Sequence, residues 1–498
     1  MNTPARSRRD FLAAAAHVAG GSALLWSLPA TRLLAKDRPR VLVLGAGLAG
    51  LRCALLLEAA GCVVTVLEAR DRPGGRLHTL HDLPGQPEEG GSVIGRSYRR
   101  MLEMAEHVGA PLATPAMGHG PKTGACKACH AQGKVPDRRG GPGSLIAWRG
   151  RLVVEGDWVD ALPELSERER GVAPDRLLAS YLQAGNPLQD AEAWTRPEHA
   201  DLDRMSLEQY LKGRGASATA LQLMDVAPNC PGLQQAAAVW ALRDAQRRAS
   251  ATGGLPLEFP AGSTAFVAAI VRALRTPPLL GHEVTSVRST ARRLVVRCRN
   301  GATHEADFGI STLPLPVLAR TALEPRPAAD QLAAFREIAY TPITRVYYRV
   351  LQPYWERDGL PVTMWTDSVL ERVFPLRDAA GEVVALVSHA DGPSAVRLDA
   401  MAMDERHRHA EQELVRLRPA TRGAVEAVAS TSWANDPFAG GAYPYYQPGQ
   451  VGRLRAAMAH PLGRLHFAGE HTAVTQPGME GAAESADRAV AEIVARLG

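Results

Sequence analysis

RVLVLGAGLAGLRCALLLEAAGCVVTVLE, residues 40–68, is the stretch that decides the fold. An apolar run over residues 40–44 leads directly into a glycine turn, and residues 51–60 then have the composition of a helix. A glycine ends that helix, and a second apolar run over residues 62–67 closes on an acid. A strand, a G-x-G-x-x-G turn, a helix and a second strand that ends in an acid are typical of a dinucleotide-binding βαβ unit.

The glycines and the acid of this unit have separate tasks. Gly45, Gly47 and Gly50 allow a tight turn and a close approach of the backbone to a pyrophosphate, whose charge then lies at the helix N-terminus. Glu68 follows eighteen positions after the third glycine and is placed to accept hydrogen bonds from a ribose. The stretch therefore predicts a bound adenine dinucleotide.

Further motifs indicate which dinucleotide is bound. Residues 68–76 read EARDRPGGR and residues 89–92 read EGGS, which suggests more phosphate contacts than a nicotinamide cofactor usually needs. Towards the C-terminus, residues 432–443 read SWANDPFAGGAY, residues 465–473 read LHFAGEHTA and residues 477–482 read PGMEGA. In this order, these motifs resemble those of the flavin monoamine oxidase family, and the resemblance spans residues 38–110 and 253–498.

The resemblance implies an α/β fold, with a Rossmann-like FAD-binding domain of the monoamine oxidase and glutathione reductase type and a discontinuous α+β substrate domain. The FAD-binding domain would take residues 37–110, 253–325 and 432–498, and the substrate domain residues 144–252 and 326–431. Residues 111–143 are rich in Gly, Pro, Lys and Arg, so we interpret them as an inserted loop. A strand is expected after it, over residues 144–154.

The resemblance also implies which residues bind the cofactor. Those expected at the ADP moiety and the pyrophosphate are Gly45, Gly47, Gly50, Glu68, Arg70, Gly75 and Arg76. Gly91 and Ser92, in the EGGS segment, are further expected cofactor-binding residues. The backbone of Val284 would meet the adenine, while Glu470 and Met479 would lie by the ribityl chain and the isoalloxazine ring. Some relatives attach the flavin through a cysteine at the position of Ala442, so FAD is expected to be non-covalent here.

Three positions concern the reaction itself. Tyr443 matches one aromatic wall of the family's substrate site, but Gly478 stands where a second aromatic residue often lies. Arg345 matches the position of a lysine that many relatives bond through water to flavin N5. Arginine keeps its charge and does not readily replace lysine at such a site, so a fast reaction with oxygen is not expected.

Residues 124–133, GACKACHAQG, contain a motif that the flavin family does not explain. C-x-x-C-H is the pattern that binds haem covalently, so Cys126 and Cys129 are the predicted thioether positions and His130 the predicted iron ligand. Met117 or His119 could supply the other axial ligand. A Cys126–Cys129 disulfide, a zinc site that includes His119, and an inert loop are the alternatives.

The N-terminus predicts export. Residues 7–12, SRRDFL, have the twin-arginine signature, and a weakly apolar run rich in Ala and Gly follows to residue 28. We expect residues 1–36 to be an export signal and the protein to be periplasmic, with a membrane contact only if the signal stays uncleaved. Of the formal charge of +5, four arginines and one aspartate within residues 1–35 account for +3, and the near-neutral remainder predicts no nucleic-acid partner.

These features predict a periplasmic FAD-dependent amine oxidoreductase. The enzyme would transfer a hydride from the α-carbon of a small amine to N5 of the flavin. The imine so formed hydrolyses, and electrons would pass through a c-type haem to a periplasmic cytochrome or another acceptor. Two alternatives are an oxygen-using amine or amino-acid oxidase with an inert loop, and a non-catalytic flavoprotein that binds a partner. An isomerase or desaturase on a lipid-like substrate is a weaker alternative, suggested by Gly478.

Overall fold

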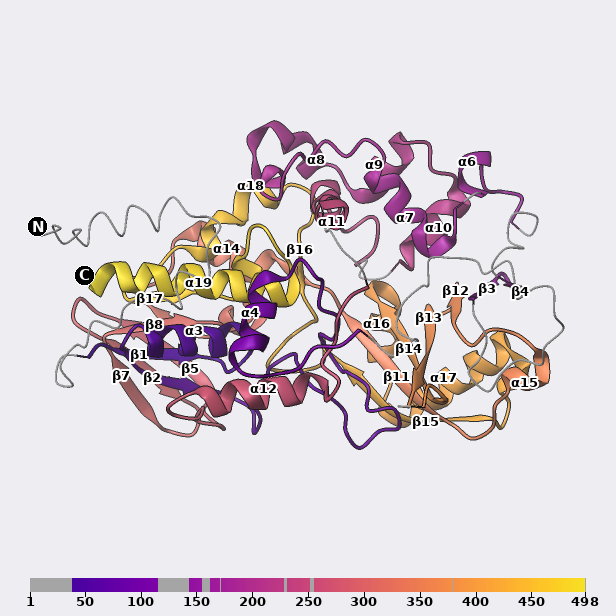
Figure 1. Ribbon diagram of the computed structural model, residues 1–498. Helices are drawn as coiled ribbons and strands as arrows, with labels where there is room; N and C mark the ends of the chain where they lie inside the picture. Colours follow the sequence, from indigo (N-terminus) through magenta and orange to yellow (C-terminus); the bar gives the residue numbers. More distant parts are fainter. Residues whose placement is uncertain are drawn as a thin grey trace, which may run out of the picture.

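A parallel sheet at one end, a seven-stranded sheet at the other and a layer of helices above them organise the molecule, which we describe from a computed structural model (Figure 1). The structure describes residues 38–114, 143–154, 162–170, 172–227, 231–250, 255–378 and 380–497. The predicted export signal and the haem motif of Cys126, Cys129 and His130 lie outside these residues.

The parallel sheet has the strand order β17-β8-β1-β2. Its strands are β1 (Arg40–Leu44), β2 (Val63–Leu67), β8 (Phe308–Ser311) and β17 (Leu465–Phe467). These short apolar runs form a parallel sheet because both of its faces are covered. Val41 and Val43 pack against helices on one face, and Leu42 and Leu44 on the other face cluster with side chains of a smaller sheet. Strands from three distant parts of the chain thus lie side by side, which confirms the predicted fold class.

The first and the last helix of the described chain pack on this sheet. They are α3 (Leu48–Ala59) and α19 (Gly478–Leu497), and a buried ion pair joins them. Nε of Arg52, whose side chain is 0% exposed, donates to the Asp487 carboxylate over 2.6 Å, and Arg100 donates to the same carboxylate over 2.9 Å. Because a buried guanidinium without a partner is strongly destabilising, this pair fixes α3 against α19.

A smaller sheet, in the order β7-β6-β5-β9, extends the same end of the molecule. Its strands are β5 (Val284–Ser289), β6 (Leu294–Cys298), β7 (Thr303–Ala306) and β9 (Ala322–Glu324). The turn before β5 passes the end of β2, where the backbone N–H of His282 donates to the carbonyl oxygen of Glu68 over 2.7 Å. This contact places Val284, at the start of β5, close to the acid of the βαβ unit.

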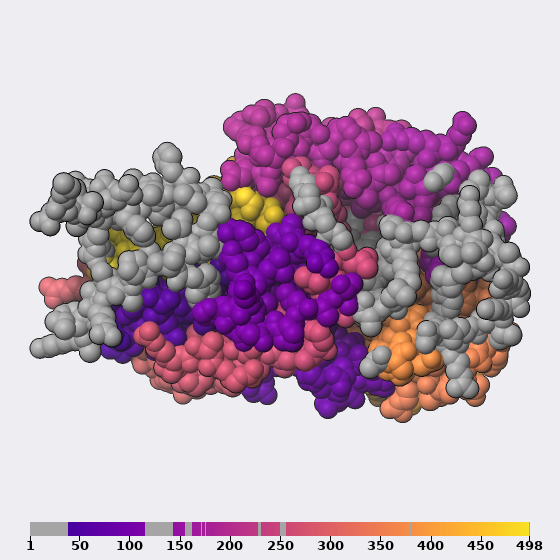
Figure 2. Space-filling model, viewed as in Figure 1, coloured from indigo at the N-terminus to yellow at the C-terminus, as the bar shows by residue number. Residues whose placement is uncertain are grey.

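The seven-stranded sheet has the order β15-β11-β14-β13-β12-β3-β4. Its strands are β3 (Leu145–Trp148), β4 (Arg151–Val154), β11 (Ile343–Val350), β12 (Met364–Thr366), β13 (Arg372–Arg377), β14 (Val383–Asp391) and β15 (Val425–Ser432). Helix α17 (Met403–Leu417) packs against β15 on one face. The helical layer consists mainly of α7 (Pro174–Gln183), α9 (Leu207–Gly213), α10 (Ala218–Asp225) and α11 (Ala238–Ser250), and Figure 2 shows it in magenta along the upper side.

The single strand expected over residues 144–154 is wrong. Strands β3 and β4 form an antiparallel hairpin whose two-residue loop is Arg149-Gly150. Both loop residues have positive φ, 49° at Arg149 and 78° at Gly150, and two-residue hairpin loops of this kind match the twist of the strands that they join. An apolar run interrupted by Arg-Gly therefore marked a turn.

The remaining elements connect these layers. They are α4 (Arg99–His107), α6 (Glu167–Arg170), α8 (Ala200–Arg204), α12 (Gly262–Ala273), α13 (Leu315–Leu318), α14 (Ala329–Glu337), α15 (Trp355–Asp358), α16 (Gly392–Asp399), α18 (Val451–Leu454), the two-stranded β10 (Ala339–Tyr340) with β16 (Pro444–Tyr445), and the 3-10 helices η1 (Ala193–Thr195), η2 (Pro197–His199), η3 (Pro419–Thr421), η4 (Ala456–Ala459) and η5 (Glu470–Thr472). In the part of the chain that the structure describes, no helix has both the length and the apolarity for a membrane span. The predicted domain boundaries stay a prediction.

Candidate active site

The glycine turn leaves room for a ligand at one position and none at another. A Cβ built at Gly50 would lie 1.9 Å from the carbonyl oxygen of Gly45, so this glycine lets the helix pack on the turn. Around a Cβ at Gly47 the space is open within 4 Å. Helix α3 starts there without a side-chain cap and without an acid in its first turn, so its N-terminal N–H groups suit an anion such as a pyrophosphate.

Glu68 and the second glycine pair border the same turn. The Glu68 carboxylate accepts hydrogen bonds from the backbone N–H groups of Ala46 (2.7 Å) and Arg70 (2.9 Å), which fix it at the end of β2. A Cβ at Gly75, where φ is 58°, would lie 3.3 Å from the Cα of Gly47. The structure therefore brings the two glycine motifs of the sequence together.

Two arginines connect this region to the C-terminal motifs. Arg70 donates to Asp436 over 2.8 Å. Arg76 forms an ion pair with Glu470 (2.5 Å) and also donates to the carbonyl oxygen of Ala442. Predicted residues from the two halves of the chain are thus in direct contact.

Met479, a predicted flavin-ring residue, lies against the EGGS segment at the start of α19. A Cβ at Gly91 would lie 3.2 Å from Sδ of Met479, and Ser92 follows at a partly exposed position. Gly478, at the first residue of the helix, has a φ of 60° and open space around its Cβ position. Tyr443 packs against a small cluster that includes Ile343 and Trp433, and its carbonyl oxygen accepts from the backbone N–H of Thr341 over 2.9 Å.

The family of the chain follows from a comparison with known proteins. Residues 48–494 match the family described as flavin containing amine oxidoreductase. The chain belongs to this family. The amine oxidoreductase is 28% identical over 490 residues to the flavin-dependent L-tryptophan oxidase RebO of Lentzea aerocolonigenes, covering 93% of this chain and 99% of that protein. It is 24% identical to human amine oxidase [flavin-containing] B, covering 92% and 86%.

Solved structures agree with this assignment at the level of the fold. A redesigned putrescine oxidase superposes with a TM-score of 0.74 at 21% identity, covering 92% of this chain and 99% of that one. Cyclohexylamine oxidase from Brevibacterium oxydans IH-35A superposes with a TM-score of 0.72 at 20% identity and the same coverage. The amine oxidoreductase therefore has the predicted fold, and its family membership shows that it is the predicted kind of enzyme.

The residues of this amine oxidoreductase fit FAD. The open space at Gly47 and the uncapped start of α3 suit the pyrophosphate, and the carboxylate of Glu68 suits a ribose. Glu470, Met479 and Gly91 would hold the flavin end. FAD, when bound, supplies the two-electron acceptor of the reaction.

Arg345 lies between the substrate sheet and this flavin end. From β11, its Nη1 donates to the carbonyl oxygens of Glu88 (2.5 Å) and Glu89 (3.0 Å), which immediately precede Gly90 and Gly91. Its Nε donates to Nδ1 of His389 over 3.1 Å. The side chain is thus held in one place by three acceptors.

Sequence reasoning missed the partners of Arg345. Arg345, His389 and Arg372 stand opposite one another on the adjacent strands β11, β14 and β13. Nε2 of His389 lies 3.0 Å from Asp391, which also accepts from Arg372 over 2.7 Å. An accepting Nδ1 requires that the proton of the neutral ring is on Nε2, facing Asp391. Polar residues within the apolar strand VVALVSHAD were the available signal.

The electrostatics of this cluster agree with that tautomer. Burial lowers the pKa of His389 to about 4, so the imidazole is neutral at physiological pH. Burial raises the pKa of the Asp391 carboxyl, but the charge of Arg372 outweighs it and holds that pKa well below its usual range. Burial also raises the pKa of the neighbouring Glu371 carboxyl. A neutral ring therefore separates two guanidinium groups.

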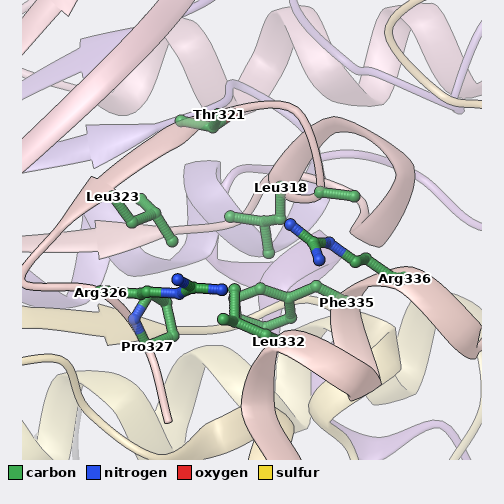
Figure 3. Close-up of a pocket in the computed structure, with 9 residues that line it drawn as sticks. Leu318, Thr321, Leu323, Arg326, Pro327, Leu332, Phe335 and Arg336 are labelled. Atoms are coloured by element: carbon green, nitrogen blue, oxygen red, sulfur yellow. The ribbon is translucent and has the colours of Figure 1, made fainter. Parts of the chain in front are cut away.

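Two other features concern metal binding and a separate cavity. The haem residues Cys126, Cys129 and His130 fall outside the described residues, and within the described ranges no three His, Cys, Asp or Glu side chains form a metal site. A cavity of about 170 Å³ lies beside β9, α13 and α14. Figure 3 shows Leu318, Leu323 and Phe335 around it, with the side chains of Arg326 and Arg336 reaching towards it. None of the predicted flavin residues lines this cavity.

Two glycine variants separate folding from cofactor binding. Gly50→Ala is expected to lower the free energy of unfolding of the apoprotein by about 1–3 kcal/mol, because the methyl group overlaps the turn. Gly47→Ala is expected to leave that free energy unchanged and to weaken FAD binding. Urea unfolding of the apoproteins would measure the free energy of unfolding, and fluorescence titration with FAD would measure the affinity for the cofactor. Equal FAD affinity of Gly47→Ala and wild type would contradict the assignment of this turn to the pyrophosphate.

His389, whose side chain is 14% exposed, makes stability depend on pH. Between about pH 6.5 and pH 4 the unfolded chain binds a proton at this histidine that the folded chain does not. The free energy of unfolding should therefore decrease as the pH falls through this window. In His389→Asn this slope should become shallower by up to about 1.4 kcal/mol per pH unit, whereas His81→Asn, at an exposed position, should keep it. Urea unfolding at several pH values would measure how steeply the free energy of unfolding changes with pH. If this slope is unchanged in both variants, His389 is not neutral in the folded protein.

Proposed function

We propose that the protein is an exported FAD-dependent amine dehydrogenase that passes electrons to a carrier other than oxygen. The observation that carries this proposal is Arg345, whose guanidinium is held against the carbonyl oxygens of Glu88 and Glu89 and against His389. The expected lysine of the family could lose its charge and bond a water molecule there. An arginine with fixed partners does neither.

The protein's own part in amine oxidation is to bind and orient the neutral amine. An amine lends its lone pair to C–H cleavage only when it is unprotonated, and a dry pocket lowers the amine pKa because it disfavours the charged form. Tyr443, in its cluster with Ile343 and Trp433, supplies one wall of such a pocket. Water then hydrolyses the imine product to an aldehyde or ketone.

The proposed route for the electrons is a c-type haem on Cys126 and Cys129, with His130 as an iron ligand. The support is the motif itself, in a chain whose N-terminus predicts export by the twin-arginine route to the periplasm. That route carries folded proteins, which suits an enzyme that binds its flavin before export. A periplasmic cytochrome would be the acceptor.

A second candidate is a true oxidase that uses oxygen directly. The names of its relatives favour it, since they include a tryptophan oxidase, an amine oxidase and a putrescine oxidase. In that case the segment with Cys126, Cys129 and His130 would have no role in electron transfer.

Reoxidation of the reduced flavin distinguishes the two candidates. After anaerobic reduction by an amine, the wild-type flavin should reoxidise slowly in air, and Arg345→Lys should accelerate this step at least about tenfold, or about 1.4 kcal/mol of activation free energy. Arg349→Lys, on the same strand at an exposed ion pair, is the matched control and should change nothing. Rapid wild-type reoxidation with stoichiometric hydrogen peroxide would favour the oxidase instead.

The haem is tested by its spectrum. Protein purified from the periplasm of a host that attaches c-type haem should show Soret and α bands that survive acid-acetone extraction. In a Cys126→Ala/Cys129→Ala double variant these bands should be absent while the flavin bands remain. Wild-type protein with a flavin spectrum alone would exclude the haem.

A further inference from the structure

Arg243, on helix α11 of the helical layer, is a buried cation without an acidic partner in contact. Its exposed fraction is 8%, and neither its Nε nor its Nη2 has a hydrogen-bond partner among the described residues. Its guanidinium carbon lies 4.4 Å from the ring centroid of Trp194. The two unpartnered atoms form one edge of the planar guanidinium, the edge that binds a carboxylate through two parallel hydrogen bonds.

Other deeply buried arginines in the described chain are compensated. Arg52 has Asp487, Arg372 has Asp391 and Arg418 has Asp358, each within 2.8 Å. A buried charge that lacks such a partner is costly, and burial accordingly lowers the pKa of Arg243. An anion that is not part of the described chain would satisfy it.

The carboxylates nearest to Arg243 are engaged elsewhere. Asp244 accepts hydrogen bonds from Arg247 and Arg248 on its own helix. Glu484 accepts from the backbone N–H groups of Val474, Thr475 and Gln476. Both charges act on Arg243 only from a distance, so its hydrogen-bonding edge stays open.

Two contacts of Trp194 connect the surroundings of Arg243 to segments that carry predicted site residues. Nε1 of Trp194, the ring over which the guanidinium lies, donates to the carbonyl oxygen of Val474 over 3.0 Å. That loop runs directly into Gly478 and Met479 at the start of α19. Tyr446, three residues after Tyr443, meets the edge of the same Trp194 ring at a centroid distance of 5.5 Å.

Helix α11 is also tied to the segment that carries Tyr443. The backbone N–H of Ala237, just before the helix, donates to the carbonyl oxygen of Tyr446 over 2.8 Å. Trp240 and Tyr445 contact edge to face at a centroid distance of 6.4 Å. In Figure 1, α11 accordingly lies at the centre of the molecule, next to β16.

We propose that Arg243 binds the carboxylate of the substrate, so that the amine oxidised by this enzyme is an amino acid. Nε–H and Nη2–H each donate to one carboxylate oxygen, and the rings of Trp194 and Tyr446 line the apolar side of this subsite. This inference rests on the proposed amine oxidation and adds the chemical class of the substrate.

The first experiment compares substrates that differ only in the carboxylate. Each natural L-amino acid and the amine left by its decarboxylation, for example phenylalanine and 2-phenylethylamine, are assayed anaerobically by flavin bleaching and with an artificial electron acceptor. The wild type should prefer the amino acid of the best pair. Arg243→Gln should lower kcat/KM for that amino acid about 10- to 100-fold, the range for a lost charge-assisted bond, and leave the matching amine unaffected. Arg243→Lys, which keeps the charge, should retain part of the preference.

A matched control tests whether the effect is only one of packing. Arg455 also lies over the Trp194 ring, at 5.8 Å, so Arg455→Gln removes a cation from the same aromatic side chain. It should keep the preference for the amino acid. An equal loss in Arg455→Gln and Arg243→Gln would overturn the proposal.

A binding measurement makes the result independent of turnover. Benzoate, titrated into the oxidised holoenzyme and followed by the flavin absorbance, should bind more tightly than the neutral benzamide, and Arg243→Gln should abolish that difference. Equal binding of the two compounds to the wild type would overturn the carboxylate subsite, even if amines bleach the flavin. Bleaching by neither amines nor amino acids would refute the proposed function, and benzoate binding would still decide the role of Arg243.

Discussion

The buried ion pair between Arg52 and Asp487 is the constraint on which the site depends. It joins the helix that begins at the glycine turn to the helix that begins at Gly478, although 435 residues separate the two side chains. Arg100 reinforces the junction through Asp487 and Glu480. A helix N-terminus binds an anionic group only in the direction in which its N–H groups point. Fixing these two helices against each other therefore also fixes the distance between the pyrophosphate site at one N-terminus and the predicted flavin-ring site at the other.

A second constraint operates on the substrate sheet. Two guanidinium groups, Arg345 and Arg372, stand on either side of one imidazole across three adjacent strands. They are compatible because His389 is neutral and Asp391 carries the compensating charge. Arg345 can thus remain charged next to the carbonyl oxygens of Glu88 and Glu89 without losing its position. The cluster makes the arginine a rigid part of the sheet and not a mobile cation.

Local sequence was sufficient for the features that local chemistry determines. The G-x-G-x-x-G turn, its flanking strands and Glu68 were predictable because each depends on residues close by in the chain, and family motifs extended the fold class to the rest. The β3–β4 hairpin was missed because Arg149-Gly150 interrupts the apolar run for only two residues, and the positive φ angles of both residues show that this short interruption is a turn. His389, Asp391 and Arg243 were missed for another reason. Polar residues within the apolar strand VVALVSHAD were a local signal for the first two, but the roles of all three depend on burial and on partners from distant segments.

The order of strands in the parallel sheet has a consequence for biosynthesis. Its edge strand β17 and the helix α19 come from the last part of the chain, whereas β1 and α3 come from the first described part. While the ribosome still holds the C-terminal residues, the N-terminal half can form its βαβ unit, but Arg52 lacks Asp487 and Arg76 lacks Glu470. Completion of the flavin site therefore waits until the segment that carries Glu470 and Asp487 has left the ribosome, and a nascent chain that stops short of residue 487 leaves Arg52 without its carboxylate partner.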